Sequence, residues 1–147
     1  MARGVGGLLG EQFQVNDQID GPQSRPDTVA VLGETTEDDG FVVTWQSTGS
    51  LLGDDQDGTS IQGRRFDSSG AALGSETQVN VTTGGDQGMP AVDSNREGTF
   101  AISWQSDSSA GDADGTSVML RRFNADFTPQ QLDPARDEVQ ANEISTG

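Results

Sequence analysis

The sequence has no cysteine, histidine, tyrosine or lysine among its 147 residues. Without cysteine, disulfides and thiolate metal ligands are excluded. Together the four absences remove most side chains that serve enzymes as bases or nucleophiles, and leave carboxylates and hydroxyls. Carboxylates alone can hydrolyse glycosides, but no pair of them stands out from the others. We therefore expect a protein that is not an enzyme and has no catalytic residues.

Positive charge is also scarce. Eight arginines face 24 acidic residues, so the formal net charge is −16. Such a field repels nucleic-acid phosphates and anionic lipids, and neither is an expected partner. Two uses of the acidity stay open: binding of divalent cations, and solubility in saline surroundings where repulsion is screened.

Long apolar runs are missing as well. No stretch approaches the ~18 apolar residues of a membrane-spanning helix, so we expect no membrane insertion. The opening MARGVGGLLG has a short, glycine-interrupted apolar run and is a poor signal peptide. If the parent protein is secreted, we expect this chain to be a mature piece of it.

Hydrophobic residues make up 31% of the chain and aromatic residues 5%, whereas glycine occurs 20 times. A core built from so few apolar residues is thin and interrupted by turns, which is typical of all-β proteins. No segment has a 3.6-residue apolar period, so we expect essentially no helix.

What the sequence does contain is a repeat with a period near 60 residues. The matching stretches are GFVVTWQS (40–47) with GTFAISWQS (98–106), SIQGRRFDSSG (60–70) with SVMLRRFNAD (117–126), and ETQVN (76–80) with QFQVN (12–16) and EVQAN (138–142). We divide the chain into an N-terminal strand that completes a neighbouring unit (1–16), a first repeat unit (17–80) and a second repeat unit (81–147).

Each unit is predicted to hold four short strands joined by polar turns. The predicted strands are Thr28–Leu32, Phe41–Ser47, Ser60–Phe66 and Thr77–Asn80 in the first unit, and Ala91–Ser94, Phe100–Ser106, Ser117–Phe123 and Val139–Asn142 in the second. An additional fourth strand is predicted at Phe13–Asn16.

The second strand of each unit has one face of large side chains and one of small ones, because alternate residues of a strand face opposite sides. The large faces are Phe41, Val43 and Trp45, and Phe100, Ile102 and Trp104; the small faces are Val42, Thr44 and Gln46, and Ala101, Ser103 and Gln105. This pattern suits sheets stacked large face on small face. It also predicts that both tryptophans pack in the core and do not stack on sugars.

The predicted fold is therefore all-β, with two four-stranded antiparallel β-propeller-like blades plus the extra N-terminal strand. A β-sandwich is the alternative. Two blades cannot close a ring, which takes about 4–8. We therefore expect self-association or neighbouring repeats as partners; a trimer of two-bladed chains would supply six blades.

The longest loop of each unit carries the pattern Asp-x-Asp-Gly, in GDDQDGTS (53–60) and GDADGTS (111–117). Hard cations such as Ca²⁺ need several oxygen ligands at once, and this pattern gathers carboxylates on a loop that glycine lets bend. The candidate Ca²⁺ ligands are Asp54, Asp55, Asp57, Thr59, Asp107, Asp112, Asp114 and Thr116. EF-hand spacing fails, since its twelfth position falls on Arg64. The alternative is a plain Asp-Gly turn with solvated acids.

The third strands carry the pairs Arg64-Arg65 and Arg121-Arg122. Neighbours in a strand point in opposite directions, so one arginine of each pair faces inward. We expect its guanidinium to bind an Asp or a backbone carbonyl. Binding of an anionic sugar or phosphate is the alternative.

The motifs FVVTWQS, RRFD-x-x-G-x-x-LG and E-x-QVN resemble the tandem repeats of very large secreted or surface-anchored bacterial proteins, which often carry calcium-binding toxin-type or cadherin-like modules. The resemblance is strong over 11–94, clear over 95–123 and weak beyond, where NADFTPQQLDPARDE replaces a glycine-rich turn. It implies an extracellular or cell-surface location and a structural or adhesive role, with Ca²⁺ stabilising the Asp-Gly loops. The alternative is a glycan-binding, lectin-like propeller formed by oligomerisation, with glycans as partners.

Overall fold

A computed structural model of the chain describes residues 11–35, 38–49, 55, 57–107, 115–131 and 137–142. In these ranges the chain forms strands and no helix, which confirms the all-β prediction. The strands are β1 (Gln23–Val31), β2 (Gly40–Thr48), β3 (Thr59–Asp67), β4 (Thr77–Gln78), β5 (Gln87–Ser94), β6 (Phe100–Ser106), β7 (Ser117–Phe123), β8 (Pro129–Gln130) and β9 (Val139–Gln140). Within the same ranges there is no helix long and apolar enough to cross a membrane.

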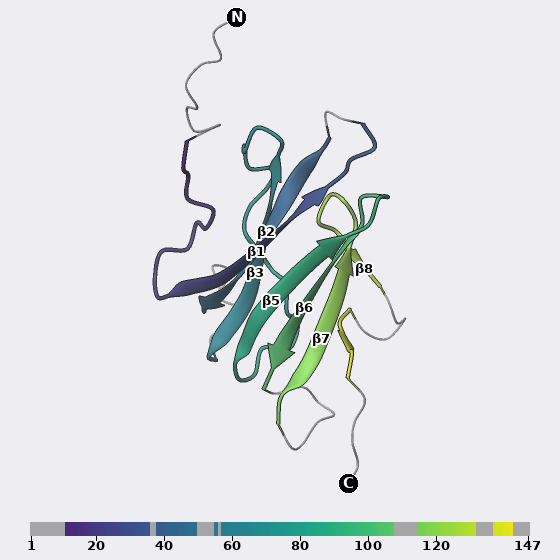
Figure 1. Cartoon of the computed structure of the whole chain (residues 1–147). Coiled ribbons are helices and arrows are strands. Elements are labelled where there is room, and N and C mark those ends of the chain that lie inside the picture. The colour runs from purple at the N-terminus through teal and green to yellow at the C-terminus, as the bar shows by residue number, and fades with distance from the viewer. Residues whose placement is uncertain are drawn as a thin grey trace, which may run out of the picture.

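The strands form two antiparallel sheets that lie against each other (Figure 1). The first sheet has the order β1-β2-β3-β4 and the second the order β5-β6-β7-β8, with β9 also pairing with β7. This arrangement is compatible with the β-sandwich alternative; a propeller would need further sheets around it. β8 was not predicted, and it shares the edge of β7 with β9.

The two sheets are built on the same register. Phe41 lies opposite Phe66 in the first sheet, and Phe100 lies opposite Phe123 in the second. Both first strands are also interrupted by an irregularity just before a proline, between Ser24 and Asp27 in β1 and between Gly88 and Ala91 in β5. The residues that directly precede the prolines, Arg25 and Met89, both have a left-handed φ of 53°, which residues other than glycine seldom adopt. A shared backbone distortion of this kind indicates that the two units are copies of one design.

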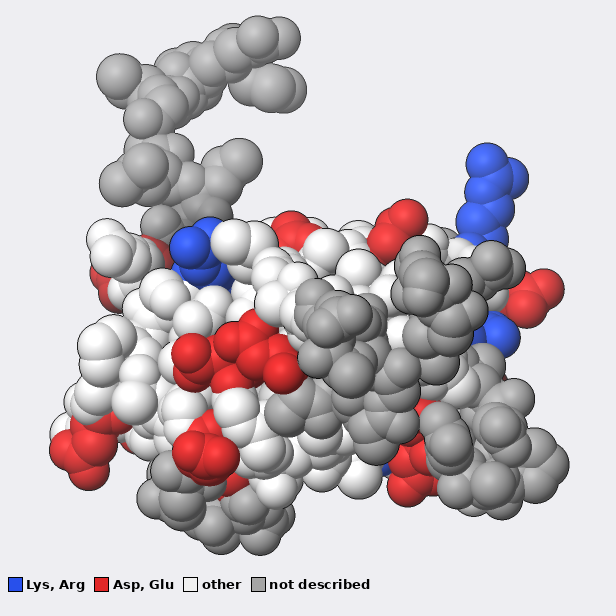
Figure 2. All heavy atoms as spheres, turned by 90° about the horizontal axis from the view of Figure 1, so that it is seen from below, with Lys and Arg blue, Asp and Glu red and all other residues white. Residues whose placement is uncertain are grey.

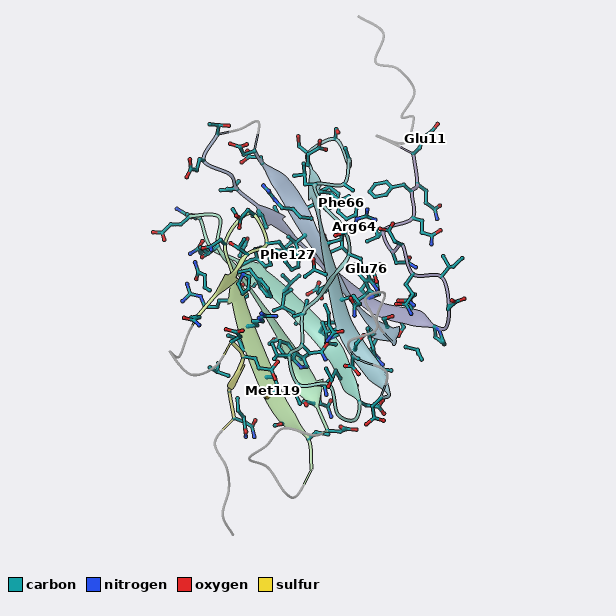
Figure 3. All side chains as sticks on the ribbon, turned by 180° about the vertical axis from the view of Figure 1, so that it is seen from behind. Glu11, Arg64, Phe66, Glu76, Met119 and Phe127 are labelled. Atoms are coloured by element: carbon teal, nitrogen blue, oxygen red, sulfur yellow. The ribbon has the colours of Figure 1, made fainter. Side chains whose placement is uncertain are left out.

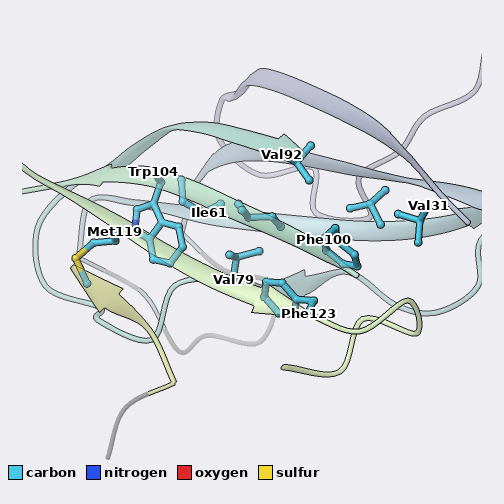
Figure 4. Packing of buried hydrophobic residues seen from close by; sticks show 10 residues of the cluster. Val31, Ile61, Val79, Val92, Phe100, Trp104, Met119 and Phe123 are labelled. Carbon is cyan, nitrogen blue, oxygen red and sulfur yellow. The ribbon is translucent and has the colours of Figure 1, made fainter. Parts of the chain in front are cut away.

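The core lies between the sheets and joins a large face to a small one, as predicted. Its members from the first sheet side are Val31, Val42, Ile61 and Val79, and those from the second sheet are Val92, Phe100, Ile102, Trp104, Met119 and Phe123. Figure 4 shows these side chains meeting between the two layers. The small face of the first sheet thus packs against the large face of the second.

A second, smaller cluster lies on the opposite face of the first sheet. Val43, Trp45 and Phe66 are buried there beneath Phe41 and Val15. Val15 belongs to the N-terminal segment, which runs along this face (Figure 3). The large face of the first sheet is therefore covered by a segment of chain, whereas that of the second sheet is covered by a whole sheet.

Within this single chain, the segment Phe13–Asn16 is not part of a strand; its pairing with a neighbouring unit stays a prediction. A strand requires a neighbouring strand edge for its backbone hydrogen bonds. In the described part of the chain no strand pairs with this segment. A side chain holds it instead: Arg64 donates to the backbone carbonyl of Val15.

Candidate functional site

The first Asp-Gly loop connects β2 to β3 and places Asp55, Asp57 and Thr59 together. Gly58 lets it turn, with a left-handed φ of +86°. A Cβ at Gly58 would lie 2.5 Å from Oδ1 of Asp86, so the close approach of the two loops also requires glycine. Of the ligands predicted in this loop, Asp54 lies outside the described residues.

Asp55 is fully buried, unlike a solvated loop acid. Its Oδ2 accepts a hydrogen bond from Nδ2 of Asn80 at 2.7 Å, and its Oδ1 accepts one from the backbone N–H of Asp57 at 3.3 Å. Burial raises the pKa of this carboxyl, although both hydrogen bonds act in the other direction. Asp55 thus ties its loop to the residue that follows β4.

Two hydrogen bonds join this loop to the connection between the two sheets, one accepted by Asp57 of the loop and one accepted by Asp86 of the connection. Asp57 Oδ2 accepts from the N–H of Gly85 at 3.2 Å, and Asp86 Oδ1 accepts from the N–H of Thr59 at 3.0 Å. Asp86 was not predicted as a site residue. Its signal in the sequence is Gly-Gly-Asp at 84–86, a turn pattern that does not indicate which other loop it contacts.

In the second Asp-Gly loop, the structure describes Asp107 and Thr116, both exposed. The N–H of Asp107 donates to the backbone carbonyl of Asp86 at 3.0 Å, so this loop starts beside the first one. The remaining predicted ligands, Asp112 and Asp114, lie outside the described residues. Seen from below, acidic side chains are visible at this end of the molecule (Figure 2).

The described residues of the two Asp-Gly loops supply too few free oxygens for Ca²⁺. That ion takes six to eight oxygen ligands. Within the described ranges no three acidic side chains are grouped closely enough to hold a metal ion, and the oxygens of Asp55, Asp57 and Asp86 accept hydrogen bonds from N–H groups. The described residues therefore do not form a complete site by themselves. Calcium binding stays a prediction that also involves Asp54, Asp112 and Asp114.

A second set of charged residues holds the N-terminal segment on the first sheet; we call it the first junction. Nη1 of Arg64 donates to the carbonyl of Val15 at 3.0 Å and to Oδ1 of Asp17 at 2.7 Å. Glu76 is 2% exposed, and its Oε2 accepts from the N–H groups of Asp17 and Gln18 at 2.8 and 3.3 Å. Figure 3 labels Arg64 and Glu76 on the side of the sheet that faces this segment.

The second junction repeats this arrangement between the two units. Nη1 of Arg121 donates to the carbonyl of Val79 at 2.8 Å. Glu138 accepts from the N–H groups of Val81 and Thr82 at 2.7 and 3.0 Å, and from the Thr82 hydroxyl. Arg64 and Arg121 are the members of their pairs that face the preceding segment of chain, and we call them inward in this sense, although Arg64 lies on the outer face of the first sheet. Both guanidinium groups bind a backbone carbonyl, as predicted. The role of the two glutamates was not predicted; its signal was the Glu shared by ETQVN and EVQAN.

Burial lowers the pKa of Arg121, and the negative charges of Asp137 and Glu138 oppose that shift. The guanidinium stays charged, because an arginine pKa lies far above neutrality. A charged donor and a charged acceptor thus both act on the chain segment between the two sheets, and charge-assisted hydrogen bonds are the strong ones.

An asparagine closes the fourth strand of each sheet. Oδ1 of Asn80 accepts from the N–H of Ile61 at 2.8 Å, and Oδ1 of Asn142 accepts from the N–H of Val118 at the same distance. The side chain thereby continues the ladder where the two-residue strands β4 and β9 end. The repeated Gln-x-Asn in the sequence is the signal for this feature.

Both tryptophans are buried, as predicted. Trp45 is 4% exposed and Trp104 is 2% exposed. Their Nε1–H groups donate to the side-chain carbonyls of Gln23 and Gln87, each at 3.1 Å. Rings that are enclosed and hydrogen-bonded in this way are not available to stack on a sugar.

A groove of about 490 Å³ lies at the other end of the strands, among the turns that join them. Its charged lining residues are Glu34, Asp38, Glu97, Asp126 and Arg65. Nη2 of Arg65 donates to the backbone carbonyl of Asp38 at 2.9 Å. Four acids around one arginine disfavour the anionic sugar or phosphate that the arginine pairs alone had left open.

No protein-family model, curated protein or solved structure matches this chain. The assignment of function therefore depends on the geometry of the loops and the junctions.

Proposed function

We propose that the chain is a non-catalytic structural or adhesive module of an extracellular protein, made of propeller-blade-like units that attach to one another. The observation that supports this is the repeated junction. In both junctions, an inward arginine donates a hydrogen bond to a backbone carbonyl, and a buried glutamate accepts hydrogen bonds from two successive backbone N–H groups. Two largely buried glutamates and the arginines beside them thus hold each unit to the segment before it.

The energies of these contacts suit a cohesive role. A hydrogen bond to a charged group contributes about 1.5–3 kcal/mol, and removing the donor leaves a buried charge without compensation. Glu76 and Glu138 are 2% and 7% exposed, so their hydrogen bonds form in surroundings with little water, where such bonds are strong. Units joined in this way resist being pulled apart.

An extracellular setting is supported by the repeat resemblance and by the net charge of −16. Salt outside the cell screens the mutual repulsion of the acids. Calcium bound at the Asp-Gly loops would reduce this repulsion further. Extracellular modules typically bind Ca²⁺ with dissociation constants of about 10⁻⁴–10⁻³ M, so millimolar Ca²⁺ is sufficient.

The test of the structural role is mechanical. Because the chain has no cysteine, engineered cysteines at Glu11 and Gly147, which leave the side chains of both junctions in place, give unique attachment points for stretching single molecules. We expect the two units to unfold together, with an extension of roughly 40 nm at about 3.5 Å per residue. In the Glu138→Gln variant the second junction is weakened while the strands are kept, so two smaller events are expected. A chain that extends without resistance contradicts the structural role.

The calcium part is tested in the same instrument and by thermal unfolding. We expect a higher unfolding force and temperature in millimolar Ca²⁺ than in EGTA, and loss of the difference in the combined Asp57→Asn, Asp112→Asn and Asp114→Asn variant. Asp20→Asn, an exposed acid outside the loops, is the matched control. Unfolding that is indifferent to Ca²⁺ and to EGTA would remove the ion from the proposal. Binding on a glycan array would favour the lectin alternative.

A further inference from the structure

The N-terminal segment shares its sequence and two side-chain hydrogen bonds with the segment that includes β4, although no strand pairs with it in the described part of the chain. It carries the same residues, Gln-Val-Asn, as the segment that includes β4. The same two side-chain hydrogen bonds form in both segments: Gln14 Nε2 to Asn16 O and Asn16 Nδ2 to Gln18 O, and Gln78 Nε2 to Asn80 O and Asn80 Nδ2 to Thr82 O. A segment that is already held by such hydrogen bonds loses less conformational entropy when it binds a strand edge.

β4, which has the same sequence pattern as the N-terminal segment, shows which kind of strand edge this segment fits: β4 lies on the edge of β3. There Gln78 lies opposite Gln62 of β3, and Asn80 accepts from the N–H of Ile61. In the second sheet the equivalent edge belongs to β7, where Met119 lies opposite Gln140. The strand on that edge, β9, has two residues, the same length as β4.

The fit of β9 to this edge is poorer than that of the N-terminal segment. The residue after Gln140 is Ala141, whereas Val15 and Val79 stand at that position in the other two copies. Val79 is fully buried in the core, so the position favours a larger apolar side chain. The segment Phe13–Asn16 would therefore bury more apolar surface on β7 than β9 does.

We propose that two copies of the chain associate head to tail, with Phe13–Asn16 of one copy replacing Val139–Asn142 on the β7 edge of the next. The outer face of the first sheet then lies against the outer face of the second sheet of the other copy. This inference rests on the proposed function, because it names the partner of the same module. A heterologous contact of this kind closes into a ring or continues as a filament.

The two outer faces are complementary in shape. A hollow of about 190 Å³ on the first sheet is lined by Val15, Val43 and Trp45, among others. Inside the chain, Ile61 occupies the equivalent place near Trp104 (Figure 4). The residue equivalent to Ile61 in the second sheet is Val118, which is 45% exposed on the outer face. Val118 of a second copy is placed to fill the hollow.

The sheet–sheet contact within the chain and the proposed contact between two copies place large and small residues in opposite ways. Inside the chain, Gly63 leaves room for the ring of Phe127; a Cβ there would lie 2.6 Å from the ring Cζ. Between copies, Leu120 stands in place of Gly63, and Gly70 stands in place of Phe127, at the same turn position and with a similar positive φ. A larger strand residue therefore meets a smaller turn residue, and Leu120 reaches the ring of Phe13, which is 49% exposed.

The first measurement is the solution mass of the full chain by light scattering, at rising protein concentration and in 0.15 M and 1 M NaCl. We expect a mass above that of one chain, growing with concentration. Salt should strengthen the association, because each copy carries −16 charges. A monomer at every concentration in both salts overturns the proposal.

Two engineered cysteine pairs test the exchange itself. Leu120 lies opposite Val139, so Leu120→Cys with Val139→Cys locks β9 on its own edge once oxidised. We expect this locked chain to stay monomeric and to associate after reduction. Phe13→Cys with Leu120→Cys should instead form disulfides between copies. A locked chain that associates as well as the wild type overturns the exchange.

Asn16→Ala and Asn142→Ala form a matched pair with opposite expected effects. The first removes the carboxamide that would accept from the N–H of Val118 in the next copy, and should weaken association about tenfold. The second weakens the hold of β9 and should strengthen association. Equal effects of the two variants contradict the proposal. The stretching of single chains does not depend on association, so its result distinguishes failure of this inference from failure of the proposed function.

Discussion

The two sheets carry the same face of large side chains, but they differ in what covers it. Phe100 of the second sheet is 2% exposed, and it stacks on Phe123 at 5.3 Å and meets the edge of Phe127 at 5.1 Å. Its equivalent in the first sheet, Phe41, is half-buried and stacks on Phe66 at 5.2 Å. The comparison teaches that neighbours on the face, more than the strand's own residues, decide how much each ring contributes to stability.

The largest expected effect comes from removing these two rings. Phe100→Ala should lower the free energy of unfolding by about 3–5 kcal/mol, the usual cost for a fully buried phenylalanine. Phe41→Ala should cost clearly less, since part of its ring is already in contact with water. Urea unfolding of both variants measures the difference. Equal losses would mean that the two faces are covered equally well.

A smaller effect is expected where the turns differ. Gly63→Ala places a Cβ against the ring of Phe127 and should cost about 1–3 kcal/mol, as overpacking does. In a Phe127→Gly background the same change should cost less, because the ring is gone. The coupling in this double-mutant cycle should exceed about 0.5 kcal/mol. Strictly additive losses would show that the glycine is not there for the ring.

The smallest expected effect concerns two aspartates, one in each unit, whose pKa values are shifted in opposite directions. The hydroxyl and the N–H of Thr128 lower the pKa of Asp126, whereas burial raises the pKa of Asp55. The stability contributed by Asp126 is present above its unfolded pKa, about 3.9, and is lost as the pH falls further. That of Asp55 is present below its unfolded pKa and is lost as the pH rises through its folded value.

Two asparagine variants separate these contributions. On acidification from neutral pH, Asp126→Asn should lose less stability than the wild type, and Asp55→Asn should lose more. Unfolding curves recorded across this pH range provide the measurement, and NMR titration of the two carboxyls gives their order directly. An Asp55 that titrates below Asp126 would contradict the assignment.

The strands that could be predicted are those with a clear alternation. The ranges Phe100–Ser106 and Ser117–Phe123 agree with β6 and β7 at both ends. The first strand of the first unit begins at Gln23, five residues before the predicted Thr28. The irregularity around Arg25 and the following proline interrupts the alternation there, so the pattern shows only the later part of the strand.

The candidate site was harder to predict. Strand alternation predicted that one arginine of each pair faces a neighbouring element, with an Asp or a backbone carbonyl as its partner, and the structure shows the carbonyl in both units. The burial of Glu76 and Glu138 could not be predicted, because a glutamate next to a two-residue strand has the same local sequence whether it is solvated or buried. Asp55 was predicted as a ligand on an open loop, yet it is buried beside Asn80, a residue 25 positions away.

The sequence by itself determined the two units, the alternation of large and small faces, and the inward direction of one arginine in each pair. These properties follow from backbone geometry within a strand, which is local. Only the tertiary structure decided which large face is covered by a sheet, and which acids are buried. Those outcomes depend on how segments far apart in the chain are stacked, and the two copies are stacked differently although their strands are nearly the same.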